Sequence, residues 1–366
     1  MFDNDKRIVM TLDAGGTNLV FTAIQANEPV VEEIRIPTDS QNLDNCLENI
    51  IDGFSQVKAK LTEEPVAISF AFPGPADYPN GIIGDLPNLP AFRGGVALGP
   101  MLAEKFGIPV FINNDGDLYA YGEAIAGFLP KVNKKLEEAG SPRRYKNLLG
   151  LTLGTGFGAG IVRDNELFLG DNSIGGEIWL VRNKISPNDN IEENASIRAV
   201  KREYAKLAGI NIEDAPTPKE IYEIAKEEKE GDKQAALSAY EILGEATGDA
   251  ISNAVTLVDG LIVIGGGLSG AAEFFMPKLL NEMNGCFNKS DGSKLPRLVA
   301  DVYNLDNDEE LEKFIKGNVK EITVPYTDKK VKYDSSPRIG IGISTIGTSK
   351  AISIGAYAYA LNQLDK

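Results

Sequence analysis

Hydrophobic and polar residues follow two different patterns along this chain. Short apolar runs bounded by glycine, asparagine or proline are typical of buried strands, and they alternate with longer segments whose apolar residues recur every three or four positions, as in amphipathic helices. The clearest helical stripe, between Asn42 and Leu61, consists of Leu43, Leu47, Ile50, Phe54, Val57 and Leu61. We interpret this stripe as core, not as a site.

The alternation predicts an α/β fold, whose ligands gather at the carboxyl ends of strands. An antiparallel opening sheet is expected from strands Arg7 to Asp13, Leu19 to Gln25 and Val31 to Pro37. Later strands are expected at Pro65 to Phe72, Val110 to Asn113, Leu261 to Ile264 and Arg338 to Ile343, with a strand–turn–strand unit at Leu148 to Arg163. Further helices are expected at Leu98 to Phe106, Leu118 to Ala126, Ser196 to Leu207, Pro218 to Lys229, Lys233 to Val258 and Lys350 to Leu364.

The 366 residues exceed the length at which one core usually keeps growing, so two domains are expected. We predict an N-terminal α/β lobe at residues 1–127, joined by the C-terminal helix 350–366, and a second α/β lobe at residues 128–349. Lys131 to Lys146 forms a polar stretch. Residues 284–337 are interpreted as a charged surface insertion with two short strands around Glu321 to Tyr333, and we assign it no chemistry.

The net charge of −16 disfavours nonspecific binding to nucleic acid or to an anionic membrane. Only two cysteines, Cys46 and Cys286, are present, so a disulfide framework is not expected. No apolar stretch is long enough for a signal peptide or a membrane span, which predicts a cytoplasmic protein. The chain has no histidine, which excludes Ser-His-Asp and Cys-His catalysis and leaves Asp or Glu as general base.

Two glycine turns lie between apolar strands, at Leu12 to Asn18 and at Thr152 to Gly158. Glycine lets backbone N–H groups approach an anion, so both turns predict phosphate binding, although each alone also fits an ordinary hairpin. Asp13 would repel a phosphate unless a cation lay between them, which suggests Mg²⁺.

A third glycine cluster, Gly265-Gly266-Gly267, follows a strand but lacks the spacing of a dinucleotide-binding fold. No P-loop motif is present either. Asp115 lies where a strand ends, which favours a ligand role, although an acid before a helix also fits an N-cap. We expect Asp117 to be the cap of that helix and Glu123 to be structural.

Seven motifs occur in the order found in the ROK family of sugar kinases, which this chain therefore resembles over nearly its whole length. They are Asp13-x-Gly15-Gly16-Thr17-Asn18, Pro73-Gly74-Pro75, Asn88-Leu89-Pro90, Asn114-Asp115, Thr152-Leu153-Gly154-Thr155-Gly156, Gly176-Glu177 and Gly265-Gly266-Gly267. The resemblance implies a two-lobed actin-like ATPase fold of duplicated ribonuclease H-like domains, with ATP and a hexose in the cleft between the lobes.

The resemblance also implies roles for individual residues. Asp13 would help to place Mg²⁺, through a water-mediated contact, beside the first phosphate motif of Gly15, Gly16, Thr17 and Asn18. Thr152, Gly154, Thr155 and Gly156 would form the second phosphate motif, and Gly265, Gly266 and Gly267 the adenosine motif. Asn114 and Asp115 would hold the sugar, with Asp115 as the catalytic base, and Asn88, Glu177 and Glu192 would be further sugar contacts. Members of the family commonly form dimers, so a homodimer is expected.

The sequence also departs from the family pattern. Leu180 stands where the family has a histidine, and Asn183 to Ile191 contains no Cys or His where the family has a zinc segment, so zinc is excluded there on ligand chemistry. Trp179, the only tryptophan, either fills the space of the lost metal loop or stacks on a sugar, and packing is favoured. Some ROK proteins carry an N-terminal DNA-binding segment, but the first strand here is expected at Arg7, and no nucleic-acid partner is expected.

The first hypothesis is therefore a glucokinase-like enzyme without zinc, in which Asp115 accepts a proton from the sugar hydroxyl at C6 as that oxygen attacks the γ-phosphoryl of ATP. Two alternatives stay open. One is a kinase for fructose or N-acetylmannosamine, and the other is a noncatalytic sugar-binding regulatory protein with the same fold.

Overall fold

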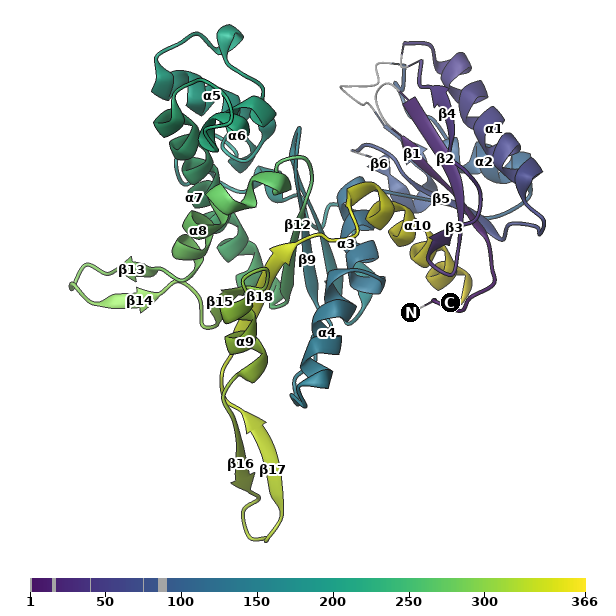
Figure 1. The fold of residues 1–366 in the computed structure, drawn as a ribbon. Helices are drawn as coiled ribbons and strands as arrows, with labels where there is room; N and C mark the ends of the chain where they lie inside the picture. The colour runs from purple at the N-terminus through teal and green to yellow at the C-terminus, as the bar shows by residue number, and fades with distance from the viewer. Residues whose placement is uncertain (1, 15–17, 40, 75, 85–90) are drawn as a thin grey trace. The chain divides into compact units, whose positions relative to one another are not determined.

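The chain folds into two compact units in the computed structural model, which describes residues 2–14, 18–39, 41–74, 76–84 and 91–366 (Figure 1). The first unit comprises residues 1–127, 160–176 and 346–366, and the second comprises residues 128–159 and 177–345. Within the described residues, none of the helices is both long and apolar enough to span a membrane.

The first sheet is built on three parallel strands, β1 (Val9–Ala14), β5 (Ala67–Ala71) and β8 (Val110–Asn113), in the order β1-β5-β8. Antiparallel to β1 lies β2 (Asn18–Gln25), which also pairs with β3 (Glu28–Pro29) and β4 (Ile34–Pro37). The predicted antiparallel opening is thus confirmed. A short ribbon of β6 (Ala76–Asp77) and β7 (Ile82–Ile83) stands apart from this sheet.

The core of the first unit includes the predicted helical stripe. In α1 (Leu43–Lys60), Ile50, Phe54 and Val57 are fully buried, and the Phe54 ring packs edge-on against Phe21 with centroids 5.1 Å apart. This cluster also includes residues of α2 (Leu98–Phe106). A second cluster joins Val9, Ile24 and Ala67 of the sheet to α10 (Thr348–Leu364).

Two helices of the first unit, α3 (Asp115–Ile125) and α10, touch through their backbones. A Cβ placed on Gly122 would lie 1.9 Å from the carbonyl oxygen of Ala351, and one on Gly355 would lie 1.9 Å from that of Leu118. Only glycine allows two backbones to approach so closely, so Gly122 and Gly355 let α3 pack directly against α10.

The second sheet has the order β11-β10-β9-β12-β18-β15. Its parallel strands are β9 (Leu148–Leu153), β12 (Leu261–Gly265), β18 (Arg338–Ile343) and β15 (Asp301–Asn304), and β10 (Phe157–Arg163) pairs antiparallel with β11 (Glu166–Phe168). The predicted strands at 148–163, 261–264 and 338–343 are confirmed.

Outside residues 284–337, the helices of the second unit follow the predicted pattern with one exception. The expected helices appear as α5 (Ile197–Ala208), α6 (Pro218–Ala225) and α7 (Lys233–Val258), and the third glycine cluster is followed by α8 (Ala272–Met283). The exception is α4 (Phe128–Glu138), which occupies part of the stretch interpreted only as polar. Its buried residues Phe128, Leu129, Val132 and Leu136 form one helical face that the surrounding lysines obscured.

The charged segment at residues 284–337 holds more than surface strands. Two exposed hairpins are present, β13 (Cys286–Asn288) with β14 (Lys294–Pro296), and β16 (Val319–Thr323) with β17 (Lys330–Asp334), so the two short strands expected around Glu321 to Tyr333 are confirmed. Between the hairpins, however, β15 joins the main sheet beside β18, and α9 (Asp308–Lys316) buries Phe314 completely. The interpretation of the whole segment as surface is therefore wrong, because a few apolar residues among many acids were enough to form a core strand.

Candidate functional site

Two of the predicted acids follow neighbouring parallel strands at one edge of the first sheet. Register pairs Asp13 of β1 with Ala71 of β5, and Ala71 with Asn113 of β8, so the three residues lie at one level. Two strand spacings separate the backbones of Asp13 and Asn113, or about 10 Å. Asp115 comes two residues after Asn113, so this edge gathers both acids, as the parallel topology requires.

Asn114 caps the helix that carries Asp115. The Asn114 side-chain oxygen accepts the Gly116 N–H at 2.8 Å, and α3 begins at Asp115. The expected start at Leu118 and the expected cap Asp117 are therefore wrong, and Asp117 is buried instead. Because Asn114 supplies the cap, Asp115 is not needed for it. Its Oδ1 accepts the Gly116 N–H at 2.9 Å in the first helical turn, where the helix dipole favours a negative charge.

The negative charges of Asp13 and Asp115 repel each other. Asp115 is exposed to solvent, yet the surrounding protein atoms raise the pKa of its carboxyl by desolvation. Desolvation also raises the pKa of Asp13, a hydrogen bond from Ser349 lowers it, and repulsion from Asp115 raises it further. Two hard oxygen donors that repel each other fit a divalent cation such as Mg²⁺, since the cation would offset the repulsion.

Ser349, in the first turn of α10, is a site residue that the sequence analysis missed. It lies far from Asp13 in the chain, and no motif marks it. Several predicted residues cannot be placed, because Gly15, Gly16, Thr17 and Asn88 lie outside the described residues. Asn18 is described, and it is an exposed residue at the start of β2.

In the second unit, the structure brings two predicted nucleotide motifs together. Strands β9 and β12 are parallel, and their register pairs Thr152 with Gly265 at their carboxyl ends. Gly266 has a φ of 88°, and a Cβ there would lie 2.3 Å from the carbonyl oxygen of Leu153. The Leu268 N–H donates to the same oxygen at 3.0 Å. Glycine is thus needed at position 266 so that the chain after β12 can turn tightly over the end of β9.

Glu192 contacts the glycine turn at residues 154–157. Its Oε2 accepts the Phe157 N–H at 3.0 Å, and its Oε1 accepts from Arg198 at 2.8 Å. A Cβ on Gly156 would lie 2.6 Å from Oε2, so glycine at this position makes room for the carboxylate. The Ile197 N–H, at the start of α5, also donates to the Gly154 carbonyl at 2.8 Å. Segment 192–198 therefore supports the turn.

Arg198, six residues after Glu192 and in the first turn of α5, was not singled out from the sequence. It also binds Glu193 Oε1 at 2.7 Å. An arginine in a charged helix carries no distinguishing signal, so only the fold reveals that it pairs with an acid at the turn.

Glu177 and Trp179 interact directly, since the indole N–H donates to the Glu177 carboxylate. Trp179 is partly exposed and Leu180 is 58% exposed, whereas Ile178 is buried. The packing interpretation of Trp179 was based on its apolar neighbours, of which Ile178 is buried and Leu180 is not. Packing and sugar stacking therefore both stay predictions for Trp179.

The segment that departs from the family pattern is held by asparagine side chains. Asn183 is fully buried, and its side chain bonds the Asn190 carbonyl at 3.1 Å, the Asn194 Oδ1 at 2.7 Å and the Ile185 N–H at 2.9 Å. Ile191, in the same segment, is also fully buried. Among the described residues, no group of three or more His, Cys, Asp or Glu side chains could hold a metal ion. Hydrogen bonds and one apolar anchor thus organise this loop.

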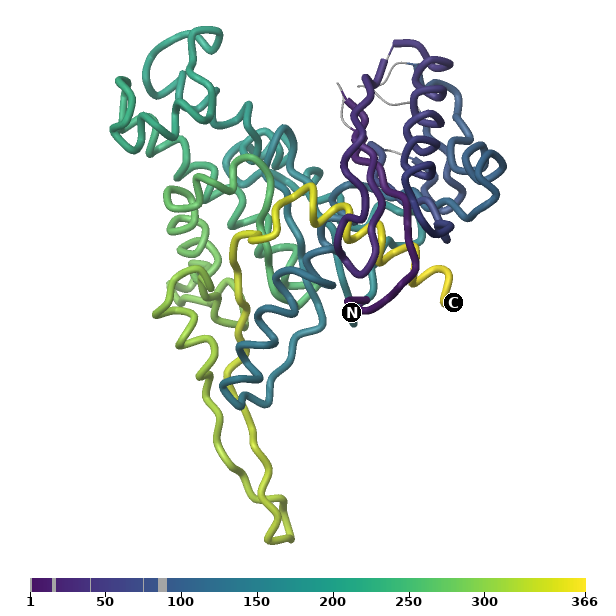
Figure 2. Tube along the Cα trace, turned by 45° about the vertical axis from the view of Figure 1, so that its right-hand side comes forward, coloured from purple at the N-terminus to yellow at the C-terminus, as the bar shows by residue number. Residues whose placement is uncertain are grey.

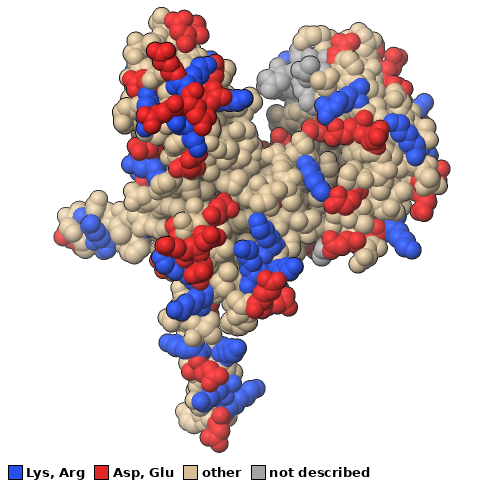
Figure 3. Space-filling view, viewed as in Figure 1, with Lys and Arg blue, Asp and Glu red and all other residues tan. Residues whose placement is uncertain are grey.

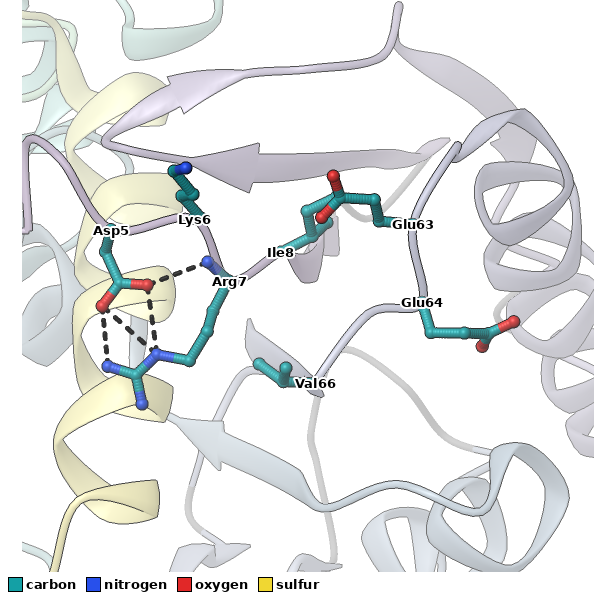
Figure 4. A pocket seen from close by; sticks show the side chains of 7 residues that line it. All are labelled: Asp5, Lys6, Arg7, Ile8, Glu63, Glu64 and Val66. Atoms are coloured by element: carbon teal, nitrogen blue, oxygen red, sulfur yellow. Dashed lines mark hydrogen bonds and ion pairs between the residues drawn. The ribbon is translucent and has the colours of Figure 1, made fainter.

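A surface pocket in the first unit lies away from these residues (Figure 4). Asp5, Arg7, Glu63 and Glu64 are among its lining residues, and they precede β1 and β5. It is therefore at the amino ends of the strands, opposite to Asp13. Arg7 is already paired with Asp5 and Asp365, at 2.7 and 2.6 Å. The pocket has no part in the candidate site.

Comparison with known proteins identifies the family of this chain. The sequence profile of the ROK family matches residues 9–304. A crystal structure described as glucokinase from Parabacteroides distasonis is 55% identical, covers 99% of both chains and superposes with a TM-score of 0.91. An N-acetyl-D-glucosamine kinase of Vibrio parahaemolyticus is 28% identical over 73% of this chain and 87% of the relative. A ROK glucokinase of Streptomyces griseus, crystallised with glucose and AMPPNP, is 16% identical over 96% of this chain and 98% of its own, with a TM-score of 0.60, and shows the shared fold. This chain belongs to the ROK family and has its two-lobed, actin-like ATPase fold.

Proposed function

We propose that this protein is an ATP-dependent glucokinase. The observation that carries the proposal is the 55% identity to a glucokinase structure over 99% of both chains, combined with an aspartate, Asp115, at the carboxyl end of a parallel strand. Such a level of similarity over the full length supports the same reaction and the same sugar.

Asp115 acts as the general base in this proposal. It accepts the proton of the glucose hydroxyl at C6 as that oxygen attacks the γ-phosphoryl of ATP, and ADP leaves. Asn114 takes over the capping of α3 and leaves the Asp115 carboxylate accessible, and desolvation raises the pKa of that carboxyl above its ordinary value, which makes it a stronger proton acceptor. Asn114, Glu177 and Asn88 are proposed to bind the sugar.

We assign the nucleotide to the glycine turns. Thr152, Gly154, Thr155 and Gly156 are proposed to bind phosphate, and Gly265 to Gly267 the adenosine, which the contact between these two segments supports. Asp13, oriented by Ser349, would hold Mg²⁺, which would neutralise phosphate charge when bound. Because ATP is the phosphoryl donor, a cytoplasmic location is favoured.

Glu192 is assigned a different part from the one expected from the sequence. Its carboxylate is occupied by Phe157 and Arg198, so we propose that it orients the phosphate turn, in addition to any contact with the sugar.

The decisive experiment is the variant Asp115→Asn, assayed for ADP release with a panel of glucose, N-acetylglucosamine, N-acetylmannosamine and fructose. We expect kcat with glucose to fall by about 10²- to 10⁴-fold while ATP affinity is unchanged, because only proton transfer is removed. The matched control is Asp44→Asn on the exposed first turn of α1. Near-normal turnover in Asp115→Asn would reject the assignment of Asp115 as the general base. Wild-type protein that binds glucose but turns over no sugar would instead identify a noncatalytic binding protein.

A further inference from the structure

Helices α5 and α6 of the second unit carry many charged side chains. Figure 2 shows the two helices together at one end of this unit, and both pack against α7. In Figure 3, acidic and basic side chains are intermingled over this end of the unit. Exposed ion pairs usually contribute little to stability. One series of them, however, leads from the start of α5 to the glycine turn at residues 154–157, which we call the phosphate turn.

Arg198, in the first turn of α5, joins two neighbouring acids through one nitrogen. Its Nη2 lies 2.8 Å from Glu192 Oε1 and 2.7 Å from Glu193 Oε1. Hydrogen bonds from Arg198 first, and from Arg202 second, lower the pKa of the Glu193 carboxyl. Glu193 therefore stays ionised, and the Arg198 guanidinium is held between two acidic side chains.

Arg202, one helical turn further along α5, binds Glu193 from the other side. Its Nη1 lies 2.8 Å from Glu193 Oε2, and its Nη2 donates to the Glu193 carbonyl. The two arginines share a face of the helix because they are four positions apart. The Arg202 Nε also lies 3.6 Å from Oε1 of the buried Glu203. Glu193 is thus fixed by two arginines of one helix face.

The series of contacts continues into the loop that asparagine side chains organise. Glu203 Oε1 accepts from the Asn194 amide at 3.5 Å, and Asn194 Oδ1 accepts from the Asn183 amide at 2.7 Å. Asn183, Asn194 and Glu203 are all buried, whereas Arg198 is exposed. The network therefore has a buried, anchored inner end and an exposed outer end at Arg198.

Glu192 connects this outer end to the phosphate turn. Its Oε2 accepts the Phe157 N–H at 3.0 Å, and Gly156 leaves space for the same oxygen. A glutamate side chain has several rotamers of similar energy, and fixing one of them costs entropy. Arg198 binds the other carboxylate oxygen and so favours the rotamer in which Oε2 faces Phe157. Loss of Arg198 should misalign Glu192 without exposing any core.

We propose that Arg198 is a positioning residue for nucleotide binding, which holds Glu192 in the orientation that fixes the phosphate turn. Glu193 and Arg202 in turn hold Arg198 in place. Arg198 acts through Glu192 and does not itself contact the nucleotide. This inference rests on the proposed function, because it concerns the turn assigned there to the phosphates of ATP.

The test measures the Kd of AMPPNP with Mg²⁺ by isothermal titration calorimetry. Arg198→Met removes the charge and keeps a long side chain, and we expect Kd to rise about fivefold, the effect of one net hydrogen bond. Arg202→Met should cause a smaller rise, because it acts one contact further away. The matched control is Lys201→Met, which removes the same charge from the same helix at a residue outside this network. Its Kd should stay within about twofold of the wild type.

A double-mutant cycle with Glu192→Ala distinguishes positioning from direct contact. If Arg198 acts only through Glu192, adding Arg198→Met to Glu192→Ala should change Kd by less than about twofold. An arginine that touched the phosphates would cause the same loss in both backgrounds. That result, or wild-type affinity in Arg198→Met, would overturn the inference.

Two further measurements complete the test. Urea titrations should give Arg198→Met and Lys201→Met nearly the same midpoint, because partly exposed ion pairs contribute little stability, so a change in Kd reports on the turn and not on unfolding. Binding of AMPPNP requires no turnover. A wild type that phosphorylates no sugar would therefore reject the proposed function, whereas the expected pattern of Kd values would still support the role of Arg198.

Discussion

The contact between α3 and α10 yields a quantitative prediction. In the variant Gly122→Ala, the new Cβ would start 1.9 Å from the Ala351 carbonyl oxygen, and an ordinary contact needs at least 3.4 Å. The obstacle is backbone and cannot rotate away, so the two helices must separate locally by about 1.5 Å. Asp115 lies at the start of α3, and the variant therefore perturbs the proposed base as well as stability.

Overpacking of this kind costs about 1–3 kcal/mol, whereas replacing glycine by alanine within a helix gains about 0.5–1 kcal/mol. We therefore expect Gly122→Ala to lower the free energy of unfolding by about 1–2 kcal/mol. The same reasoning applies to Gly355→Ala, whose Cβ would start 1.9 Å from the Leu118 carbonyl oxygen. Displacement of Asp115 by about 1 Å should also reduce kcat by up to about 10²-fold.

The double variant is the sharper test, because one separation of the two helices makes room for both methyl groups. The combined loss should be close to that of one single variant, which gives a coupling of about 1–2 kcal/mol between the sites. Urea titrations monitored by circular dichroism measure these differences, and Gly270→Ala, where nothing lies within 4 Å of the new Cβ, is the control. Strictly additive losses, or a single variant as stable as the control, would refute the backbone contact.

Three further predictions concern the site. Glu192→Ala should raise KM for ATP more than KM for glucose in initial-rate kinetics, because the N–H of buried Phe157 loses its acceptor. A rise in KM for glucose alone would favour a role in sugar binding only. Because desolvation raises the pKa of Asp115 above 3.8 and the base works only when deprotonated, kcat/KM should fall as the pH falls through that raised pKa and level off above it. A profile that stays flat down to about pH 4 would contradict this assignment. Asn183→Ala should lower the free energy of unfolding by about 1–3 kcal/mol, measured by urea titration, since the partners of a buried amide become unpaired. Added zinc should neither prevent nor reverse this loss of stability. A rescue by zinc would disprove the conclusion that hydrogen bonds organise this loop.

Local patterns predicted most of the elements, since strand and helix periodicities depend on which neighbours along the chain share a face. The stripe of α1 and the strands around Thr152 are confirmed for that reason. The ROK motifs, read in order, also predicted the family. Predictions failed where short-range signals compete: Asn114 and Asp117 are both good caps, and the lysines of α4 concealed its buried face.

The sequence by itself determined the fold class, the lack of histidine chemistry and the two acids, Asp13 and Asp115, at strand ends. Only the tertiary structure decided that Ser349 hydrogen-bonds Asp13, that Glu192 supports the phosphate turn and that β15 completes the second sheet. These partners lie far apart in the chain and meet only after the sheets form. A pattern of neighbouring residues carries no information about such contacts, since they depend on packing across strands and helices.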